Sequence, residues 1–279
     1  MSYIAVVQAD SPNLFFLLNE ASGTFTDQQG GLAAAGISGA GAAYRTATGF
    51  PAQPYGITIG STTSGIAVVS NESSQNVTGT SVSWEFCMAY NGSLVGQPFI
   101  FGKGHDGTNG GYAIMINSGG SLNIWVSGLG SYWNSGYVMP SDTTVRHYIV
   151  TLNGTTGTIY QNGVNVKAGM PSGIVTATAG TDVFPIGSGH TSGGGFTNQL
   201  VGGIVANVSL YPSVLSPARV TAHYNALTTA GSSGTSNTAP PGQAVASLAH
   251  DRNQQRKEQE QPGHRFRLSD YYRHRRHGG

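Results

Sequence analysis

Short runs of strand-forming residues, each bounded by glycine, asparagine or serine, recur through the first 211 residues of the chain. Glycine is abundant, with 42 residues, whereas long stretches of helix-forming residues are scarce. Runs of this length and spacing are typical of an all-β sandwich or barrel. The clearest runs read YGITIG, GIAVVS, SVSWEFCMAY, PFIFGK, YAIMI, LNIWVSG, HYIVTL, TIYQNG, VFPIG and IVANVSLY.

Two turn signals in HYIVTLNGTTGTIYQNGVNV predict a meander of three antiparallel strands. Asn153-Gly154 begins the first turn, and Asn162-Gly163 is a pair that favours a type I′ turn in a two-residue hairpin. Alternation along the middle strand places Ile159 on one face with Gln161 and Tyr160 on the other.

One short helix is predicted near the end of the β-rich region. Ser216 is a good N-cap, Pro217 suits the first helical position, and Gly231 ends the pattern. The apolar residues between them follow at helical spacing: Val220, Tyr224 and Leu227.

Charge and composition change near residue 230. Residues 1–230 hold five Lys/Arg and eight Asp/Glu, a net charge of −3, whereas residues 231–279 hold eight and four, a net of +4. GSSGTSNTAPPGQ is a linker composition. We therefore predict a β-sandwich domain over residues 1–230, a Gly/Ser/Pro linker over 231–243 and a basic tail over 244–279.

Several classes of protein are disfavoured by simple features. A single cysteine, Cys87, excludes an internal disulfide, and its place among strand formers predicts a buried apolar role. The N-terminus lacks the pattern of a signal peptide, and no apolar stretch is long enough to span a membrane. We interpret the five Asn-x-Ser/Thr sequons as chance matches: Asn71, Asn76, Asn91, Asn153 and Asn207.

Four stretches resemble laminin-G-like, concanavalin-A-like jelly-roll domains, and especially those found in bacteriophage structural proteins. They are VQADSPNLFFLLNEASGTFTDQQG, SVSWEFCMAY, VRHYIVTLNGTTGTIYQNGVNV and FPIGSGHTSGGGFTNQLVGGIVANVSLYPSVLSPARVTAHYNA, which together span most of residues 3–226. The resemblance implies a two-sheet antiparallel jelly-roll sandwich that binds glycans or proteins, or in some branches hydrolyses glycans. It also implies structural roles for His147 and His223, whereas the basic tail lies outside it.

A glycan hydrolase needs two carboxyl groups placed across the scissile bond. The acidic residues of the first 230 positions are scattered, and no strand carries them in a catalytic run. Glu20 and Asp27 are expected to brace loops. Glu85 stands alone in a strand, on the face opposite Trp84 and Phe86. We therefore expect no enzymatic activity, no catalytic residue and no cofactor.

Two Gly-rich loops are candidate contacts for a ligand or partner. GKGHDGTNGGY is either a polar turn or a ligand or Ca²⁺ loop, and its side chains are His105, Asp106 and Asn109. In SGLGSYWNSGYV the candidates are Tyr132, Trp133, Asn134 and Tyr137. Their rings suit sugar stacking or a protein interface, with core packing of Trp133 as the alternative. Trp84 and Trp125, which lie in strand patterns, are expected in the core.

The tail interleaves arginine with aromatic residues, which suits a protein partner or, less well, nucleic acid. A disordered solubilising tail is the third interpretation, but FRLSDYY carries more apolar content than that role needs. We interpret the tail as an assembly anchor made of Arg265, Phe266, Arg267, Tyr271, Tyr272, Arg273, Arg275 and Arg276.

These features together predict a bacteriophage virion surface protein, such as a capsid decoration, head-fibre or minor tail component. It would be made in the host cytoplasm and held in multiple copies by other virion proteins. Many copies would turn weak contacts with host-surface glycans into strong ones. The alternatives are a stand-alone carbohydrate-binding module and a glycan hydrolase.

Overall fold

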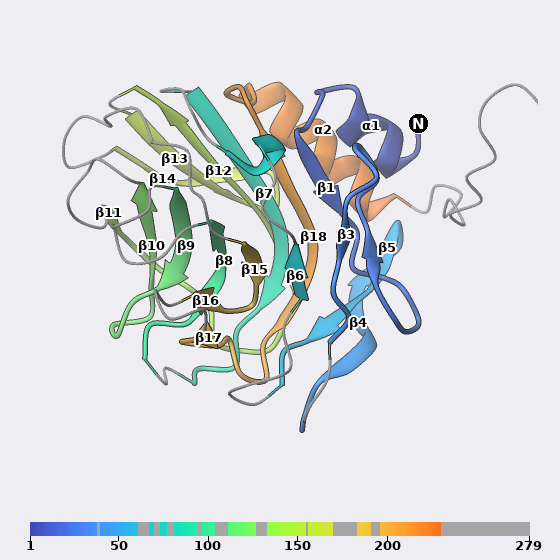
Figure 1. The fold of residues 1–279 in the computed structure, drawn as a ribbon. Helices are drawn as coiled ribbons and strands as arrows, with labels where there is room; N and C mark the ends of the chain where they lie inside the picture. The colour runs from blue at the N-terminus through green and yellow to red at the C-terminus, as the bar shows by residue number, and fades with distance from the viewer. Residues whose placement is uncertain are drawn as a thin grey trace, which may run out of the picture. The chain divides into compact units, whose positions relative to one another are not determined.

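Two antiparallel sheets packed face to face form the body of the protein (Figure 1). The computed structural model describes residues 1–37, 40–60, 67–69, 73–76, 81–93, 96–103, 111–126, 133–154, 156–169, 183–190 and 196–229. The described residues belong to one compact unit, Met1–Ser233. The predicted all-β jelly-roll sandwich is confirmed, while the boundaries at residues 230 and 243 stay predictions.

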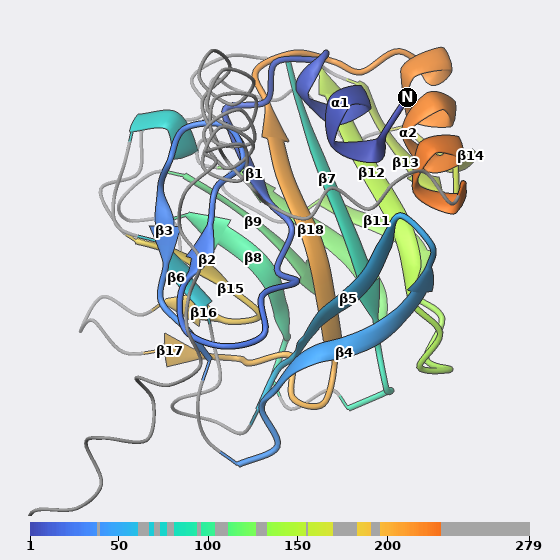
Figure 2. The ribbon, with the colours of Figure 1, turned by 90° about the vertical axis from the view of Figure 1, so that its right-hand side faces the viewer.

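Sheet A has the strand order β14-β13-β12-β7-β18-β5-β4, and β1 also pairs with β18. Figure 2 shows its central strands side by side. Its strands are β1 (Leu14–Phe16), β4 (Ala43–Phe50), β5 (Gln53–Thr58), β7 (Ser81–Ala89), β12 (Arg146–Asn153), β13 (Thr156–Gln161), β14 (Val164–Ala168) and β18 (Ile204–Tyr211).

Sheet B has the order β11-β10-β9-β8-β15-β6-β3-β2, and a separate pair, β16 and β17, forms a short hairpin. Sheet B contains β2 (Phe25–Thr26), β3 (Ala33–Ala34), β6 (Ala67–Val69), β8 (Phe99–Lys103), β9 (Tyr112–Ile116), β10 (Ser121–Val126), β11 (Trp133–Val138) and β15 (Phe184–Ile186). The hairpin strands are β16 (Gly189–His190) and β17 (Phe196–Thr197).

Alternation along the strands divides apolar residues between the space within the sandwich and its outer faces. On β7, Trp84 and Phe86 point into the main core between the sheets, whereas Glu85 and Cys87 point to the outer face of sheet A. The Phe86 ring lies 5.4 Å from the ring of Phe101 in sheet B, centroid to centroid. The predictions for Glu85 and for buried Cys87 are confirmed.

The predicted meander is confirmed by the register of β12, β13 and β14. Asn162 and Gly163 both have positive φ, at 52° and 79°, as a type I′ turn requires. Ile159 faces the main core and Tyr160 faces the opposite side, as expected from alternation.

The predicted C-terminal helix is α2 (Pro217–Thr228), and the Oγ of its N-cap Ser216 accepts the Arg219 N–H. The helix ends at Thr228, before Gly231. A second helix, α1 (Tyr3–Gln8), begins after Ser2 and lies beside α2 against sheet A (Figures 1 and 2). There is also one turn of 3₁₀ helix, η1 (Ser73–Gln75).

The sequence analysis predicted one helix and missed α1. With six residues, α1 is too short to show the helical periodicity by which α2 was found. Isolated helices of this length are unstable in water, so α1 depends on packing against the sheet.

Candidate functional site

The sequence-predicted site residues divide into those that the structure describes and those outside it. Tyr132 of the second loop and all three residues of the first loop, His105, Asp106 and Asn109, lie outside the described residues. The same holds for the anchor residues Arg265, Phe266, Arg267, Tyr271, Tyr272, Arg273, Arg275 and Arg276. Their proposed roles stay predictions.

The described part of the second loop, SGLGSYWNSGYV, is strand β11, and its side chains lie on two faces of sheet B. Trp133 is 3% exposed and packs in the main core, opposite Ile124 of β10. Of its two interpretations, core packing is the one that the structure shows. Asn134 points outward and is exposed. Tyr137 is half-buried, and its hydroxyl donates to Gln161 Oε1 in sheet A.

Trp125 lies on the other face of sheet B from Trp133. It packs with Ala113, Met115 and half-buried Phe99 in a small cluster that is separate from the main core. The predicted burial of Trp125 is confirmed, but the side chain is on the outer face of the sheet. Trp84 is fully buried between the sheets, as expected.

A row of asparagine side chains adjoins the Trp125 cluster. Asn123 of β10 and Asn134 of β11 are directly opposite each other in the antiparallel register. The Asn117 amide donates to Asn123 Oδ1 at 3.4 Å, and Asn134 Oδ1 accepts the Gly136 N–H at 3.1 Å. This outer face therefore combines neutral amides with an indole and carries no carboxylate among these residues.

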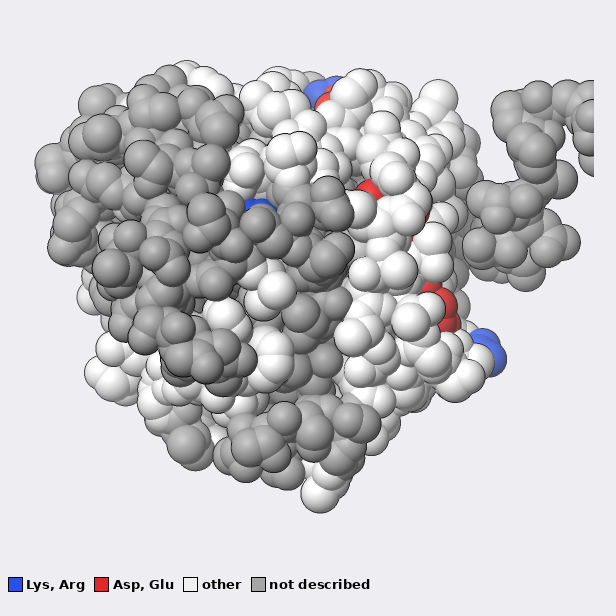
Figure 3. Space-filling model, in the orientation of Figure 1, with Lys and Arg blue, Asp and Glu red and all other residues white. Residues whose placement is uncertain are grey.

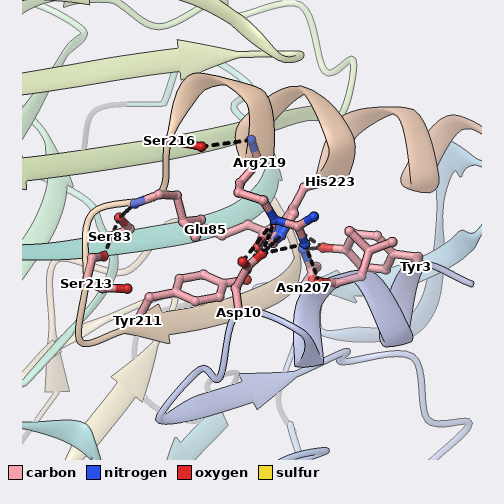
Figure 4. A network of polar contacts seen from close by, with 12 residues as sticks. Tyr3, Asp10, Ser83, Glu85, Asn207, Tyr211, Ser213, Ser216, Arg219 and His223 are labelled. Atoms are coloured by element: carbon pink, nitrogen blue, oxygen red, sulfur yellow. Dashed lines mark hydrogen bonds and ion pairs between the residues drawn. The ribbon is translucent and has the colours of Figure 1, made fainter. Parts of the chain in front are cut away.

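The outer face of sheet A is organised quite differently, around Glu85, a carboxylate with no solvent exposure (Figure 4). Its Oε1 accepts the Tyr3 hydroxyl and the His147 ring Nε2, each at 2.8 Å. Its Oε2 accepts the Tyr211 hydroxyl and, at 2.9 Å, the His223 ring Nδ1. These four donors occupy about four lone-pair positions, which is all that a carboxylate offers.

The network extends from the buried carboxylate to the edge of the two helices. His223 Nε2 is 2.6 Å from Asp10 Oδ2, and Asp10 also accepts bidentate bonds from the Arg219 guanidinium. Arg219 additionally donates to the Val6 carbonyl in α1 at 3.0 Å. The network thus joins five parts of the chain: the N-terminal segment, β7, β12, β18 and α2.

The charges in this network stabilise one another. Burial raises the pKa of Glu85, but the positive charge of His223 and hydrogen bonds from His147 and His223 lower it well below its usual value. Burial lowers the pKa of His223, yet Glu85 and Asp10 together raise it above its usual value. Burial, followed by the charge of Glu85, raises the pKa values of Tyr3 and Tyr211, so both hydroxyls stay protonated donors.

Each described carboxylate has protein partners. Asp27 accepts backbone N–H groups from Phe15, Gln29 and Gly30, and Glu20 accepts the Thr26 N–H, so both brace loops as predicted. Asp142 forms a bidentate pair with Arg146.

Two of the described carboxylates, Asp10 and Glu85, are joined through the buried ring of His223. No cluster of three or more His, Cys, Asp or Glu in the described ranges is placed to hold a metal ion. None of the described helices is long and apolar enough to cross a membrane.

Sequence reasoning identified Glu85, His147 and His223 one by one but not as a group. Glu85 was recognisable as a lone charge in an apolar strand, and the two histidines were assigned structural roles, which the network confirms. The other members could not be found, because Tyr3, Tyr211 and Asp10 are separated from their partners by 82 to 213 positions.

The family model for the concanavalin A-like lectin/glucanases superfamily, of laminin G type, matches residues 60–221, which is more than half of the chain. The chain therefore belongs to this superfamily, and it is a lectin-like β-sandwich. A comparison with curated protein sequences finds no match. The finer resemblance to bacteriophage structural proteins stays a prediction.

Solved structures with the same fold include proteins of different kinds. A Trypanosoma rangeli sialidase is 14% identical, with a TM-score of 0.54 over 78% of this chain and 33% of the sialidase chain. Domain 4 of AbnA, a GH43 extracellular arabinanase from Geobacillus stearothermophilus, in complex with arabinotriose, is 15% identical, with a TM-score of 0.54 over 76% of this chain and 98% of that domain.

The binding domain of botulinum neurotoxin serotype D is 12% identical, with a TM-score of 0.54 over 80% of this chain and 52% of that chain. The chain spans about a third of the length of the sialidase chains that it matches. At these identities the similarity shows the fold alone, and a fold of this kind serves many functions.

Proposed function

We propose that this protein is a lectin-like surface component of a bacteriophage particle: a capsid decoration, a head fibre or a minor tail protein. In this proposal the sandwich binds neutral host-surface glycans through the outer face of sheet B. The tail, residues 244–279, anchors the chain to other virion proteins. The protein acts by binding, in multiple copies, without enzymatic activity or a required cofactor.

The difference between the two outer faces is the observation that carries the glycan-binding part. On sheet A, α1 and α2 cover an apolar cluster and a carboxylate whose acceptor positions are occupied. On sheet B, the Asn123–Asn134 pair adjoins the Trp125 cluster. Asn123 and Trp125 are buried, at 5% and 7% exposed, so the exposed Asn134 is the amide of this pair that can donate and accept hydrogen bonds with an uncharged sugar.

The scarcity of charge supports a neutral rather than an acidic glycan. Lys, Arg, Asp and Glu make up 9% of the chain, and the face in Figure 3 shows only isolated charged spots among its described residues. The described carboxylates are engaged in internal contacts, which favours binding over hydrolysis. Domain 4 of the arabinanase, a complex with a neutral oligosaccharide, also supports this ligand class.

The experiment that tests glycan binding uses the full chain and compares two asparagine positions. Asn134→Asp keeps the oxygen that accepts the Gly136 N–H but removes the amide donors. Asn165→Asp makes the same change at an exposed position of edge strand β14, in the other sheet. A printed array of neutral and sialylated oligosaccharides identifies the ligand, and calorimetry then measures its affinity.

We expect binding to a neutral oligosaccharide that Asn134→Asp weakens by about 2- to 10-fold, the value of one lost hydrogen bond. Asn165→Asp should leave the affinity unchanged. Failure to bind any glycan, or equal losses in the two variants, would contradict the proposed site.

The virion part is tested on native source material. Particles are separated from soluble protein on a density gradient and treated with trypsin, and peptides from residues 231–279 are followed by mass spectrometry. We expect the chain to band with the particles and its arginine-rich tail to resist cleavage. A chain that stays soluble, or a tail that is cut at once, would contradict the anchor and favour a stand-alone carbohydrate-binding module.

A further inference from the structure

The N-terminal segment, residues 1–10, and helix α2 meet on the outer face of sheet A, although they lie at opposite ends of the domain sequence (Figures 1 and 2). The Arg219 guanidinium of α2 contacts both the Asp10 carboxylate and the Val6 carbonyl. Between them and the sheet lies the ring of His223, which has no solvent exposure.

The two ring nitrogens of His223 determine its protonation state. Nδ1 lies 2.9 Å from Glu85 Oε2, and Nε2 lies 2.6 Å from Asp10 Oδ2. Ionised carboxylates only accept hydrogen bonds, and a neutral imidazole has only one N–H to donate. Both contacts are therefore hydrogen bonds only when His223 is an imidazolium.

His147, the second histidine of the network, has a hydrogen-bond partner at only one of its two ring nitrogens. His147 Nε2 lies 2.8 Å from Glu85 Oε1, whereas its buried Nδ1 has no hydrogen-bond partner. Charging this ring would bury an N–H group without an acceptor, which is costly. A neutral His147 leaves two carboxylates, Asp10 and Glu85, balanced by two cations, Arg219 and His223.

We propose that the imidazolium of His223 is a latch that couples docking of the N-terminal segment to docking of α2, so that both loosen together when the ring loses its proton. A neutral His223 donates to only one of its two carboxylates. Glu85 keeps three other donors, whereas Asp10 lies nearer the surface, with 16% of its side chain exposed. Opening therefore begins at the contact between His223 and Asp10.

The groups that face the ring from each packed element decide the pH range. On the acid side, Glu85 keeps its charge because its pKa is lowered. On the alkaline side, burial raises the pKa values of Tyr3, Tyr211 and the Cys87 thiol, so these groups stay protonated beyond neutral pH. The hydrogen bonds to Asp10 raise the pKa of Arg219, so the guanidinium stays charged. The latch is therefore closed in mild acid and opens as pH rises, and this inference does not rest on glycan binding or a virion.

Nuclear magnetic resonance of the full chain tests the protonation state directly. Long-range ¹H–¹⁵N spectra at pH 6 should show both His223 nitrogens in the protonated range, and His147 with a proton on Nε2 alone. A neutral single tautomer of His223 at pH 6 would overturn the proposal without any mutation.

Hydrogen exchange measured by mass spectrometry at constant pH tests the coupling. His223→Gln and the milder Asp10→Asn each remove one side of the bridge, and Asp142→Asn removes an ion pair elsewhere as a control. We expect His223→Gln to speed exchange in peptides from both residues 3–10 and residues 217–228, by roughly 100-fold if the buried pair is broken.

Asp10→Asn should affect the same two peptides by a smaller factor, and Asp142→Asn should affect neither. Faster exchange in only one of the two peptides would show that the segments dock independently and would overturn the coupling. If His223→Gln does not fold, Asp10→Asn and the spectra of the unmodified protein still decide the question.

Discussion

The outer faces of the two sheets show how one sandwich can build two very different surfaces from the same alternating pattern. Sheet A carries a charged network whose centre, Glu85 and His223, has no solvent exposure, and whose edge, Asp10 and Arg219, reaches the surface. Sheet B carries neutral amides next to a small apolar cluster, and Asn134 remains exposed. The charged groups on sheet A hold the helices to the sheet, whereas the exposed Asn134 on sheet B is uncharged.

A reason for this division lies in the cost of burying charge. A buried carboxylate is tolerated only when it is paired and its hydrogen-bonding positions are filled. Glu85 meets that condition because it receives donors from α1, β12, β18 and α2. The network therefore defines how the helices sit on the sheet. Substitutions in it should lower the free energy of unfolding more than substitutions on the outer face of sheet B.

The largest effect is expected from Glu85→Gln. The amide has nearly the same shape, but it presents N–H groups to at least one set of donors and leaves His223 without its buried counter-charge. We expect a loss of about 3–5 kcal/mol in the free energy of unfolding, measured by urea denaturation. A loss similar to that of the surface variant Asp142→Asn would show that the network does not hold the helices.

The second largest effect is expected from a change of pH, because pH changes the charge of a network residue without removing its side chain. His223 has a raised pKa in the folded state, so its contribution is complete below its unfolded pKa of 6.5 and declines as pH rises through the folded pKa. Glu85 has a lowered pKa, so its contribution is present above 4.5 and is lost as pH falls through the folded pKa.

Denaturation series across pH should therefore show maximal stability between about pH 4.5 and 6.5, with a decline above that range. His223→Gln should lower stability and flatten the decline on the alkaline side. An unchanged alkaline slope in His223→Gln would assign the decline to another group.

A smaller effect is expected at the contact between the β13–β14 turn and α2. Gly163 has a φ of 79°, and a Cβ at this position would lie 3.2 Å from Tyr224 of the helix. Gly163→Ala should cost about 1–2 kcal/mol through backbone strain and this close contact. Gly154→Ala is the control, since Gly154 also has positive φ, 61°, but has nothing within 4 Å. Equal losses of stability in the two variants would show that backbone strain, and not the contact with Tyr224, causes the destabilisation.

The smallest change in stability is expected on the outer face of sheet B. Asn134 is exposed, and its side chain makes one local bond to the Gly136 N–H. Asn134→Asp preserves that acceptor, so we expect the free energy of unfolding to change by less than about 0.5 kcal/mol. Thermal melts of this variant check that any loss of glycan affinity is not a loss of folding. A large destabilisation would show that this face is structural too.

Much of the fold was predictable because it is encoded in short stretches. The Asn162-Gly163 turn, the N-cap at Ser216 and the alternation around Glu85 each depend on a few neighbouring residues. Helix α1 was not predictable in the same way, because its six residues are stabilised by distant partners such as Phe15 and Arg219.

The sequence by itself determined the all-β class, the central meander, the C-terminal helix and the scarcity of charge, because propensity, turn chemistry and alternation act locally. Only the tertiary structure decided that Trp133 faces the core while Trp125 faces outward, since that depends on the register between β10 and β11. It also brought Glu85, His223 and Asp10 within hydrogen-bonding distance, because packing alone relates residues so far apart in the chain.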